Sequence, residues 1–401
     1  MEKLYDRLKE RYPEMVEIRR HLHEHPELSF EEVETPKYIA AYHEKLGHEV
    51  RTEVGGRGVV AVLRGGKPGK TVALRADFDA LPIQEENDVE YKSKVDGVMH
   101  ACGHDGHTAT LLVLAKVLNG MRDELEGNIV FIHQHAEELA PGGAIAMIED
   151  GCLDGVDVIF GTHLWVVTPY GHIQHRTGPF MAAADKFDFV IQGKGGHGAQ
   201  PHLTKDAVVI GSQLVMNLQQ LVSRRVNPLD SAVLSIGRFE AINAFNVIAD
   251  TAKITGTVRT FKENVRDLME REIERVGKGT CLTADAEYTL SYQRGYPPVV
   301  NHKDETDFVA RVAGDVPGVT AVVECEPDMG GEDFAYYLQH VKGTFFYTGA
   351  QDASRDEMYP HHHPKFNIDE RAMLVAANTL GAAAVTFLKE AAIKEETTVK
   401  K

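Results

Sequence analysis

The sequence has few cysteines, no excess of positive charge and no long uninterrupted apolar run. Its four cysteines, at positions 102, 152, 281 and 325, are far apart and show no Cys-x-x-Cys spacing, which favours a reducing compartment over a disulfide framework. Sixty Asp and Glu residues against 43 Lys and Arg residues give a formal net charge of −17, so we expect neither nucleic acid nor an anionic membrane as a partner. The charged N-terminus lacks the apolar core of a signal peptide, and no run of about 18 apolar residues exists, so we expect no membrane span and a cytoplasmic protein.

The length and the order of the predicted elements indicate two domains. A chain of 401 residues exceeds the usual size of one domain. Strands alternate with helices over residues 1–182 and again over 296–401, which predicts an α/β fold with a mostly parallel sheet. Between them, residues 183–295 follow a β-α-β-β-α-β order, which predicts a small α+β domain inserted into the larger one.

The stretch Met99–His107 carries three histidines, one cysteine and one aspartate. Cys102 and His104 are one residue apart, so their side chains can meet at one point only if the backbone is extended or turning there, and Gly103 permits a turn. An apolar segment that follows predicts a buried helix. Such a loop is typical of a divalent metal site, although a glycine-rich turn with solvated histidines would have the same composition.

Further acidic and imidazole side chains come just after predicted strands. Asp77 and Asp79 follow one strand, Glu137 and Glu138 follow another, and His163 follows a third. Because ligands of open α/β sheets bind at the carboxyl ends of the strands, we expect these side chains to gather at one edge.

Together these residues predict a site for two metal ions. Cys102, His104, Glu138, His163 and one of His361–His363 would mix thiolate, imidazole and carboxylate, which suits Zn, Mn, Co or Ni, and five ligands exceed the need of one structural zinc. Neighbouring side chains of an extended segment point in opposite directions. One of the Glu137–Glu138 pair can therefore bind metal while the other takes the proton of an attacking water and passes it to the leaving nitrogen.

Six motifs in sequence order carry a family resemblance that covers essentially the whole chain. The chain resembles the N-acyl-L-amino-acid amidohydrolases, hippurate hydrolases and auxin-conjugate hydrolases of the dinuclear metallo-aminoacylase and carboxypeptidase superfamily. The motifs are Arg20–Leu28, Leu74–Pro82, Met99–His107, His135–Glu138, Gly195–His202 and His362–Phe366.

The resemblance implies a role for each matching residue. The metal ligands would be Cys102, His104, Glu138, His163 and His362, with Glu137 as general acid/base. His362 is preferred because the family's ligand lies two residues before the proline. The inserted domain would be a lid that forms a homodimer or homotetramer, with His197 reaching an active site, its own or its partner's, to stabilise the oxyanion. Asn246 and Arg259 would hold the substrate's α-carboxylate.

Some of these assignments have simpler alternatives. His197 in a glycine-rich turn could be an ordinary loop residue, and Arg259 could pair with a local carboxylate. Wider relatives place a metal-binding histidine where Asp77 stands, so one interpretation makes Asp77 a group that supports the ligands; the sequence leaves the roles of Asp77 and Asp79 open. The chain departs from the family's pattern at Phe78, Gly198 and Ala249.

The function expected from the sequence is therefore the hydrolysis of N-acyl-L-amino acids. The acyl group could be acetyl, benzoyl or similar. A carboxypeptidase or dipeptidase would use the same residues on a peptide bond, and a protein that only binds acyl-amino acids is the alternative of another class.

Overall fold

The computed structural model describes residues 1–354 and 357–399, without the side chains of 395–399. It divides into two compact units. Unit 1 comprises residues 1–178, 300–326 and 333–401, and unit 2 comprises 179–299 and 327–332.

Unit 1 contains an eight-stranded sheet in the order β1-β2-β4-β3-β5-β16-β6-β15. The central strands β4, β3, β5 and β16 run parallel, whereas β1 and β2 add antiparallel pairs at one edge. This confirms the α/β class with a mostly parallel sheet. The strands are β1 (Glu49–Val54), β2 (Gly58–Arg64), β3 (Lys67–Asp77), β4 (Glu126–Gln134), β5 (Val158–Pro169), β6 (His172–His175), β15 (Ala321–Glu324) and β16 (Lys342–Gln351).

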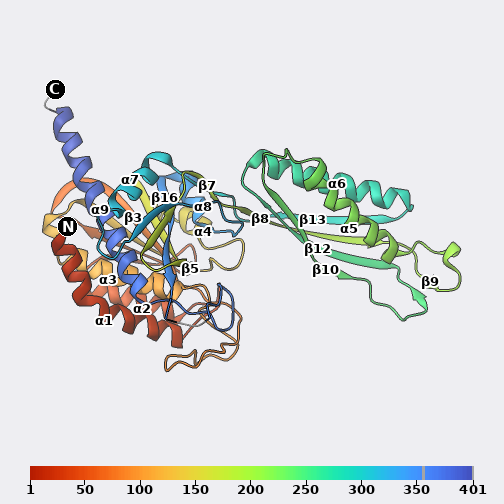
Figure 1. Ribbon diagram of the computed structural model, residues 1–401, viewed down its shortest axis with the longest axis horizontal. Coiled ribbons are helices and arrows are strands. Elements are labelled where there is room, and N and C mark those ends of the chain that lie inside the picture. Colours follow the sequence, from red (N-terminus) through yellow and green to blue (C-terminus); the bar gives the residue numbers. More distant parts are fainter. Residues whose placement is uncertain (355–356, 400–401) are drawn as a thin grey trace. The chain divides into compact units, whose positions relative to one another are not determined.

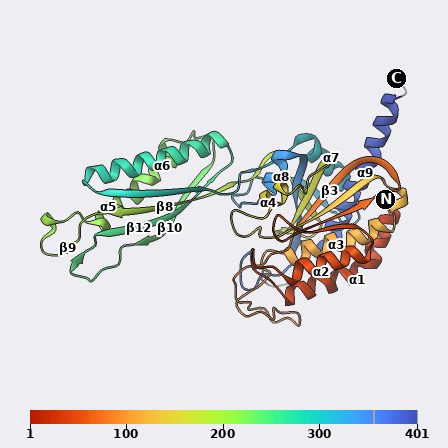
Figure 2. The ribbon, with the colours of Figure 1, turned by 180° about the vertical axis from the view of Figure 1, so that it is seen from behind.

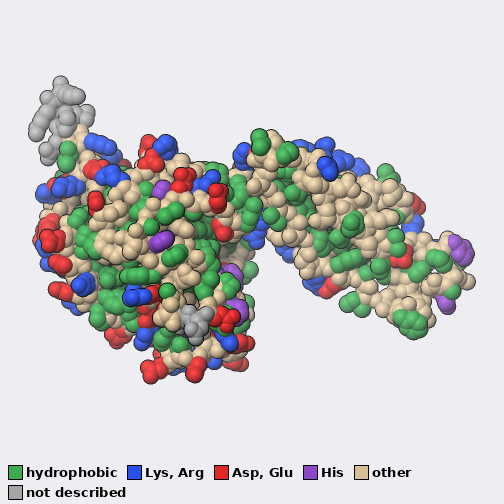
Figure 3. Space-filling model, viewed as in Figure 1, with side chains coloured by type: hydrophobic (Ala, Val, Ile, Leu, Met, Phe, Trp, Pro, Cys, Tyr) green, Lys and Arg blue, Asp and Glu red, His purple; other side chains and the backbone are tan. Residues whose placement is uncertain are grey.

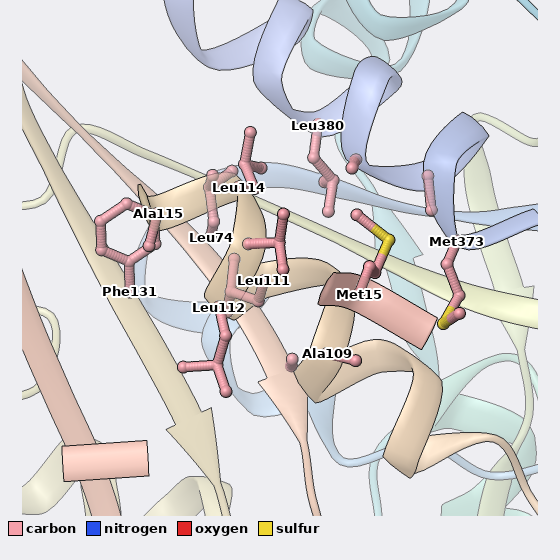
Figure 4. Packing of buried hydrophobic residues seen from close by; sticks show 14 of the residues in the cluster. Met15, Leu74, Ala109, Leu111, Leu112, Leu114, Ala115, Phe131, Met373 and Leu380 are labelled. Atoms are coloured by element: carbon pink, nitrogen blue, oxygen red, sulfur yellow. The ribbon is translucent and has the colours of Figure 1, made fainter. Parts of the chain in front are cut away.

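Helices α2 and α3 lie against this sheet, and α1 packs on α3 and α9 (Figures 1 and 2). The apolar stretch after His107 forms α3, whose leucines are buried between β3 and β4 and the C-terminal helix α9 (Figure 4). The helices are α1 (Glu2–Glu24), α2 (Glu34–Lys45), α3 (His104–Asn119), α4 (Ala144–Glu149), α7 (Lys303–Ala313), α8 (Phe334–His340) and α9 (Arg371–Val399), with the short helix η1 (Arg122–Glu124).

Helix α9 is apolar enough to cross a membrane by length and composition, but its position is that of a core helix. Of its most apolar window within residues 371–394, 72% is buried inside the protein. The charged end of the chain continues this helix through Val399, although the sequence suggests a frayed tail from Lys394 onward.

Unit 2 is a four-stranded antiparallel sheet in the order β10-β12-β8-β13, with α5 and α6 on one face (Figures 1 and 2). The side chain of Asp206 caps α5 by accepting hydrogen bonds from the backbone N–H groups of Val208 and Val209, as expected at a helix N-terminus. A two-stranded ribbon of β9 and β11 is added to the predicted elements. The elements are β7 (Gly178–Met181), β8 (Ala183–Gln192), β9 (Gly196–His197), η2 (Pro201–Leu203), α5 (Ala207–Arg224), β10 (Ala232–Glu240), β11 (Val247–Ile248), β12 (Thr251–Thr260), α6 (Glu263–Thr283), β13 (Glu287–Arg294) and, at the boundary, β14 (Val299–Asn301).

Unit 2 includes a short segment that lies, in sequence order, within the part predicted to belong to the larger domain. Residues 327–332 belong to unit 2 because the Ala182 N–H bonds to the carbonyls of Asp328 and Gly330, and the Asp328 N–H bonds to the Phe180 carbonyl. Such long-range backbone pairing leaves no periodic signal in the sequence.

Three histidines form a hydrogen-bonded chain in the core of unit 1. The Nδ1 atoms of His43 and His48 are 2.9 Å apart, and the Nε2 atoms of His43 and His133 are also 2.9 Å apart. Burial lowers the pKa of His43 to about 2, that of His133 to about 3 and that of His48 to about 4. All three imidazoles are therefore neutral in the folded protein near pH 7.

The three neutral, buried histidines indicate that the protein loses stability in mild acid. The unfolded state takes up protons below the ordinary histidine pKa of about 6.5 while the folded state does not, so the free energy of unfolding falls as the pH decreases. We expect these three groups to lower it by about 2–4 kcal/mol between pH 7.5 and 5.5, measured by urea unfolding of metal-free protein. In His48→Phe, one of the three histidines is replaced by an aromatic ring that can still stack on Phe131. The free energy of unfolding should therefore fall less on acidification in this variant than in the wild type. An unchanged pH dependence in that variant would contradict the prediction.

Candidate metal centre and active site

The predicted metal ligands come from four separate segments of unit 1. Cys102 and His104 stand at the N-terminus of α3, where Gly103 adopts φ +97°, a left-handed conformation that favours glycine. Glu138 lies in the turn after β4, and His362 precedes α9. His163 lies inside β5 and not after its end, which corrects the expected strand boundary.

The structure brings these five side chains together. The Sγ atom of Cys102 is 3.4 Å from Nε2 of His163. The two carboxylate oxygens of Glu138 are 3.8 Å from Nε2 of His104 and 3.3 Å from Nε2 of His362. Two overlapping groups result, each with donor atoms within 4.8 Å of one another: Cys102 with His104 and His163, and Cys102 with Glu138 and His362.

The donor atoms fit a divalent cation. Among the described residues, Nε2 of His104 and Oε1 of Glu138 are buried and have no hydrogen-bond partner. Leaving such a polar atom unpaired costs about 1–3 kcal/mol, and a cation between them would remove this cost. Burial alone would lower the pKa of His104, but Asp77, Asp79 and Glu138 raise it to about 10. The negative charge around this imidazole therefore favours a cation, and the mixture of sulfur, nitrogen and oxygen suits a transition metal.

Asp79 orients two of the predicted ligands. Its Oδ1 lies 3.1 Å from Nδ1 of His104, and its Oδ2 accepts the backbone N–H of Glu138 at 2.9 Å. A histidine that donates from Nδ1 presents the lone pair of Nε2 to a metal. Asp79 therefore contacts two of the proposed ligands, a role that the sequence left open.

Asp77 contacts a histidine that sequence reasoning did not select. Its two carboxylate oxygens lie 2.6 Å from Nδ1 of His107 and 2.6 Å from Arg75, and the other ring nitrogen of His107 accepts the N–H of Leu164 at 2.9 Å. His107 thereby holds the backbone next to His163. The signal was present, because His107 lies three residues after His104 and faces the same side of the helix.

Aromatic stacking supports the loop that carries His362. The ring of Trp165 is stacked between Tyr347, at 4.2 Å, and His361, at 4.3 Å. His361 also bonds to the Leu164 carbonyl at 3.1 Å. The side chain of His361 is thus engaged by the stack and by this hydrogen bond. His362, at φ +65°, faces Glu138 instead. Trp165, the single tryptophan, lies 5.1 Å from the ring of His163.

Glu137 is placed beside the candidate metal ligands. Its side chain is 9% exposed, and its Oε2 is 3.9 Å from Nε2 of His104. A carboxylate in this position can reach a water held by a cation at the ligands. The geometry is suitable for a general base.

His197 and Asn246 lie together in unit 2. The β9–β11 ribbon pairs His197 with Val247, and the Asn246 carbonyl accepts the Gly198 N–H. A side chain at Gly198 would come within 2.8 Å of that carbonyl, which explains this departure from the family's pattern. Nδ1 of His197 accepts the Ala199 N–H, so a neutral ring carries its proton on Nε2 and can donate it. Histidines are visible at the end of unit 2 that carries β9 (Figure 3).

Arg259 is half-buried on β12. Burial lowers its pKa, and within the described part of the chain no carboxylate forms a salt bridge with it. Asp185 and Asp328 act on this pKa in the opposite direction, so negative charge is near the guanidinium although no salt bridge forms.

Comparisons with known proteins place this arrangement in a family. Residues 73–386 match the family described as peptidase family M20/M25/M40. The Bacillus subtilis protein YhaA, named as an amidohydrolase, is 61% identical over 94% of this chain and 95% of its own length. The N-acyl-L-amino acid amidohydrolase of Geobacillus stearothermophilus is 50% identical over 73% of this chain and 79% of its own. The Bacillus subtilis YxeP structure, titled a dinuclear metal-binding peptidase, has a TM-score of 0.81 and 37% identity, and covers 95% of this chain and 99% of its own.

Proposed function

The chain belongs to peptidase family M20/M25/M40 and is a metal-dependent amide hydrolase, and we propose that its substrates are N-acyl-L-amino acids. The observation that carries metal-dependent hydrolysis at this site is the pair of buried, unpartnered atoms, Nε2 of His104 and Oε1 of Glu138, beside Glu137. The acyl-amino-acid specificity is supported by the relative named for that activity, which is 50% identical.

We assign two divalent ions, Zn, Mn, Co or Ni, to Cys102, His104, Glu138, His163 and His362. Bound there, they would supply Lewis acidity that polarises the amide carbonyl and lowers the pKa of the attacking water. The two overlapping groups of donor atoms and the dinuclear title of the YxeP structure support this number.

The other site residues each have a proposed role in hydrolysis. Glu137 accepts a proton from the attacking water and transfers it to the amide nitrogen, so that the C–N bond breaks to a carboxylic acid and a free amino acid. The Nε2–H of His197 donates to the carbonyl oxygen as negative charge develops there. Arg259 and Asn246 bind the α-carboxylate of the substrate.

Unit 2 is proposed to act as a lid and as the contact of a homodimer or homotetramer. The exposed apolar side chains Ile242 and Phe245, 91% and 102% exposed beside Asn246, support an interface at this end. His197 would serve its own or the partner's site. A cytoplasmic location is supported by the four cysteines, all of which are free thiols.

A substrate panel tests the specificity. With metal added, we expect N-acetyl- and N-benzoyl-amino acids to be cleaved at least about tenfold faster, as kcat/KM, than dipeptides. N-acyl-amino acid amides, which lack the α-carboxylate, should react poorly because Arg259 then has no ionic partner. The peptidase title of the YxeP structure makes dipeptide hydrolysis the second candidate, and cleavage of dipeptides alone would establish it instead.

A further inference from the structure

The turn that carries Glu137 has a strained backbone. Ala136, directly before Glu137, is fully buried and adopts φ +52°, a left-handed conformation that disfavours residues with a Cβ atom. A strained position persists only where its surroundings hold it in place. The contacts of Ala136 therefore determine how Glu137 is presented.

A buried glutamate, outside the set of proposed ligands and bases, makes such a contact. Glu32, in the turn between α1 and α2, is 0% exposed, and its Oε1 accepts the backbone N–H of Ala136 at 2.9 Å. Its Oε2 has no hydrogen-bond partner and is 4.0 Å from Nε of Arg57, whose Nη1 donates to the Glu32 backbone carbonyl. The carboxyl group of Glu32 is thus fixed by its contact with the Ala136 N–H, and its backbone by Arg57.

The backbone N–H groups of the residues before and after Glu137 bond to carboxylates. Glu32 accepts the N–H of Ala136, and Asp79 accepts the N–H of Glu138. The same N-terminal turn contacts Asp79 as well, because the hydroxyl of Ser29 donates to its Oδ2 at 2.7 Å. The backbone of Glu137 is therefore restrained at both ends by residues from the turn around 29–32 and from the end of β3.

We propose that Glu32 is a positioning residue for catalysis, which holds Ala136 in its left-handed conformation and thereby aims the Glu137 carboxylate at the reacting water and amide. The proposal rests on the catalytic role of Glu137 given above. Glu32 itself touches neither substrate nor metal ligands. Its effect should therefore appear in kcat and leave metal binding intact.

Three variants separate positioning from general damage. In Glu32→Ala the Ala136 N–H loses its acceptor, and we expect kcat to fall by about 10- to 100-fold, as for a small misplacement of a catalytic group, with KM and metal stoichiometry little changed. Burial raises the pKa of Glu32 to about 7, so the neutral amide of Glu32→Gln resembles its protonated form and still offers an oxygen acceptor. That variant should keep kcat within about threefold. Glu31→Ala, at the exposed neighbouring position, is the matched control and should be unaffected.

A double-mutant cycle tests the role of the strain. Glycine adopts φ > 0 without cost, so in an Ala136→Gly background the Glu32→Ala change should cost much less than in the wild type. Equal losses in both backgrounds would overturn the proposal. So would equal losses in Glu32→Gln and Glu32→Ala, or a Glu32→Ala enzyme as active as Glu31→Ala.

Hydrogen exchange of the Ala136 amide gives a readout that does not depend on turnover. The amide should exchange faster in Glu32→Ala than in the wild type and in Glu32→Gln, whichever amide the enzyme cleaves. Unchanged exchange in Glu32→Ala would refute the positioning contact. A wild-type enzyme that cleaves only dipeptides, or no amide of the panel, would instead contradict the proposed function.

Discussion

Glu137→Gln is expected to lower kcat by about 10³-fold or more while the protein still binds metal. The carboxylate is proposed to carry the proton from water to the leaving nitrogen, and loss of a general acid/base typically costs about 10²–10⁴ in rate. The amide of Gln cannot accept that proton. Steady-state hydrolysis of an acetylated amino acid measures kcat, and metal analysis of the purified variant measures whether metal is still bound.

Glu138→Gln is the matched comparison at the adjacent residue. Both carboxylate oxygens of Glu138 face imidazole nitrogens of proposed ligands, at 3.8 and 3.3 Å, so this variant should lose metal affinity as well as activity. Full metal affinity in Glu138→Gln would contradict the role of Glu138 as a ligand. Normal turnover in Glu137→Gln would contradict the role of Glu137 as general acid/base.

Removal of metal is expected to abolish hydrolysis and to destabilise the protein. A ligand that binds only the folded state adds about 2.7 kcal/mol at a concentration of one hundred times its Kd. Chelated protein should therefore unfold at a lower temperature, and Zn, Mn, Co or Ni should restore both stability and turnover. Because Trp165 lies 5.1 Å from His163, its fluorescence should change as metal binds.

Cys102→Ala and Cys152→Ala form a matched pair for this experiment. Both thiols are buried, but only Cys102 lies among the donor atoms. Stabilisation by metal should be weakened in Cys102→Ala and preserved in Cys152→Ala. Burial raises the pKa of the Cys102 thiol, and since a metal binds the thiolate, binding should release a proton. Apparent affinity should then weaken about tenfold per pH unit of acidification for each proton released, and equal metal responses in the two variants would exclude Cys102 as a ligand.

Much of the fold and of the candidate site could be predicted because their signals are local. Alternating apolar strands and helices indicate an α/β sheet, and Cys102 and His104 occur in one short motif. Histidine, cysteine and glutamate side chains near strand ends indicate metal chemistry, because few other residues bind such ions. The family, the hydrolytic activity and the mostly parallel sheet could therefore be predicted from the sequence.

The remaining features depend on contacts between segments that are distant along the chain. By residue type alone the run His361–His363 contains three candidates, of which the family resemblance prefers His362. The structure adds the stacking of His361 on Trp165 and the contact of His362 with Glu138. The contact of His107 with Leu164, and that of Glu32 with Ala136, join residues 57 and 104 positions apart. Periodicity shows which face of an element is buried, but it does not show which side chain it meets there.

The type of fold, the family and the kinds of atoms available for chemistry can be read from the amino-acid sequence, because each follows from residue types in short, recognisable patterns. The unpartnered atoms, the pairing of aspartates with histidines and the support of the backbone before Glu137 become visible only in the folded protein. Those properties arise from packing, since a hydrogen bond or a buried orphan atom exists only once remote segments have been brought within a few ångströms of each other.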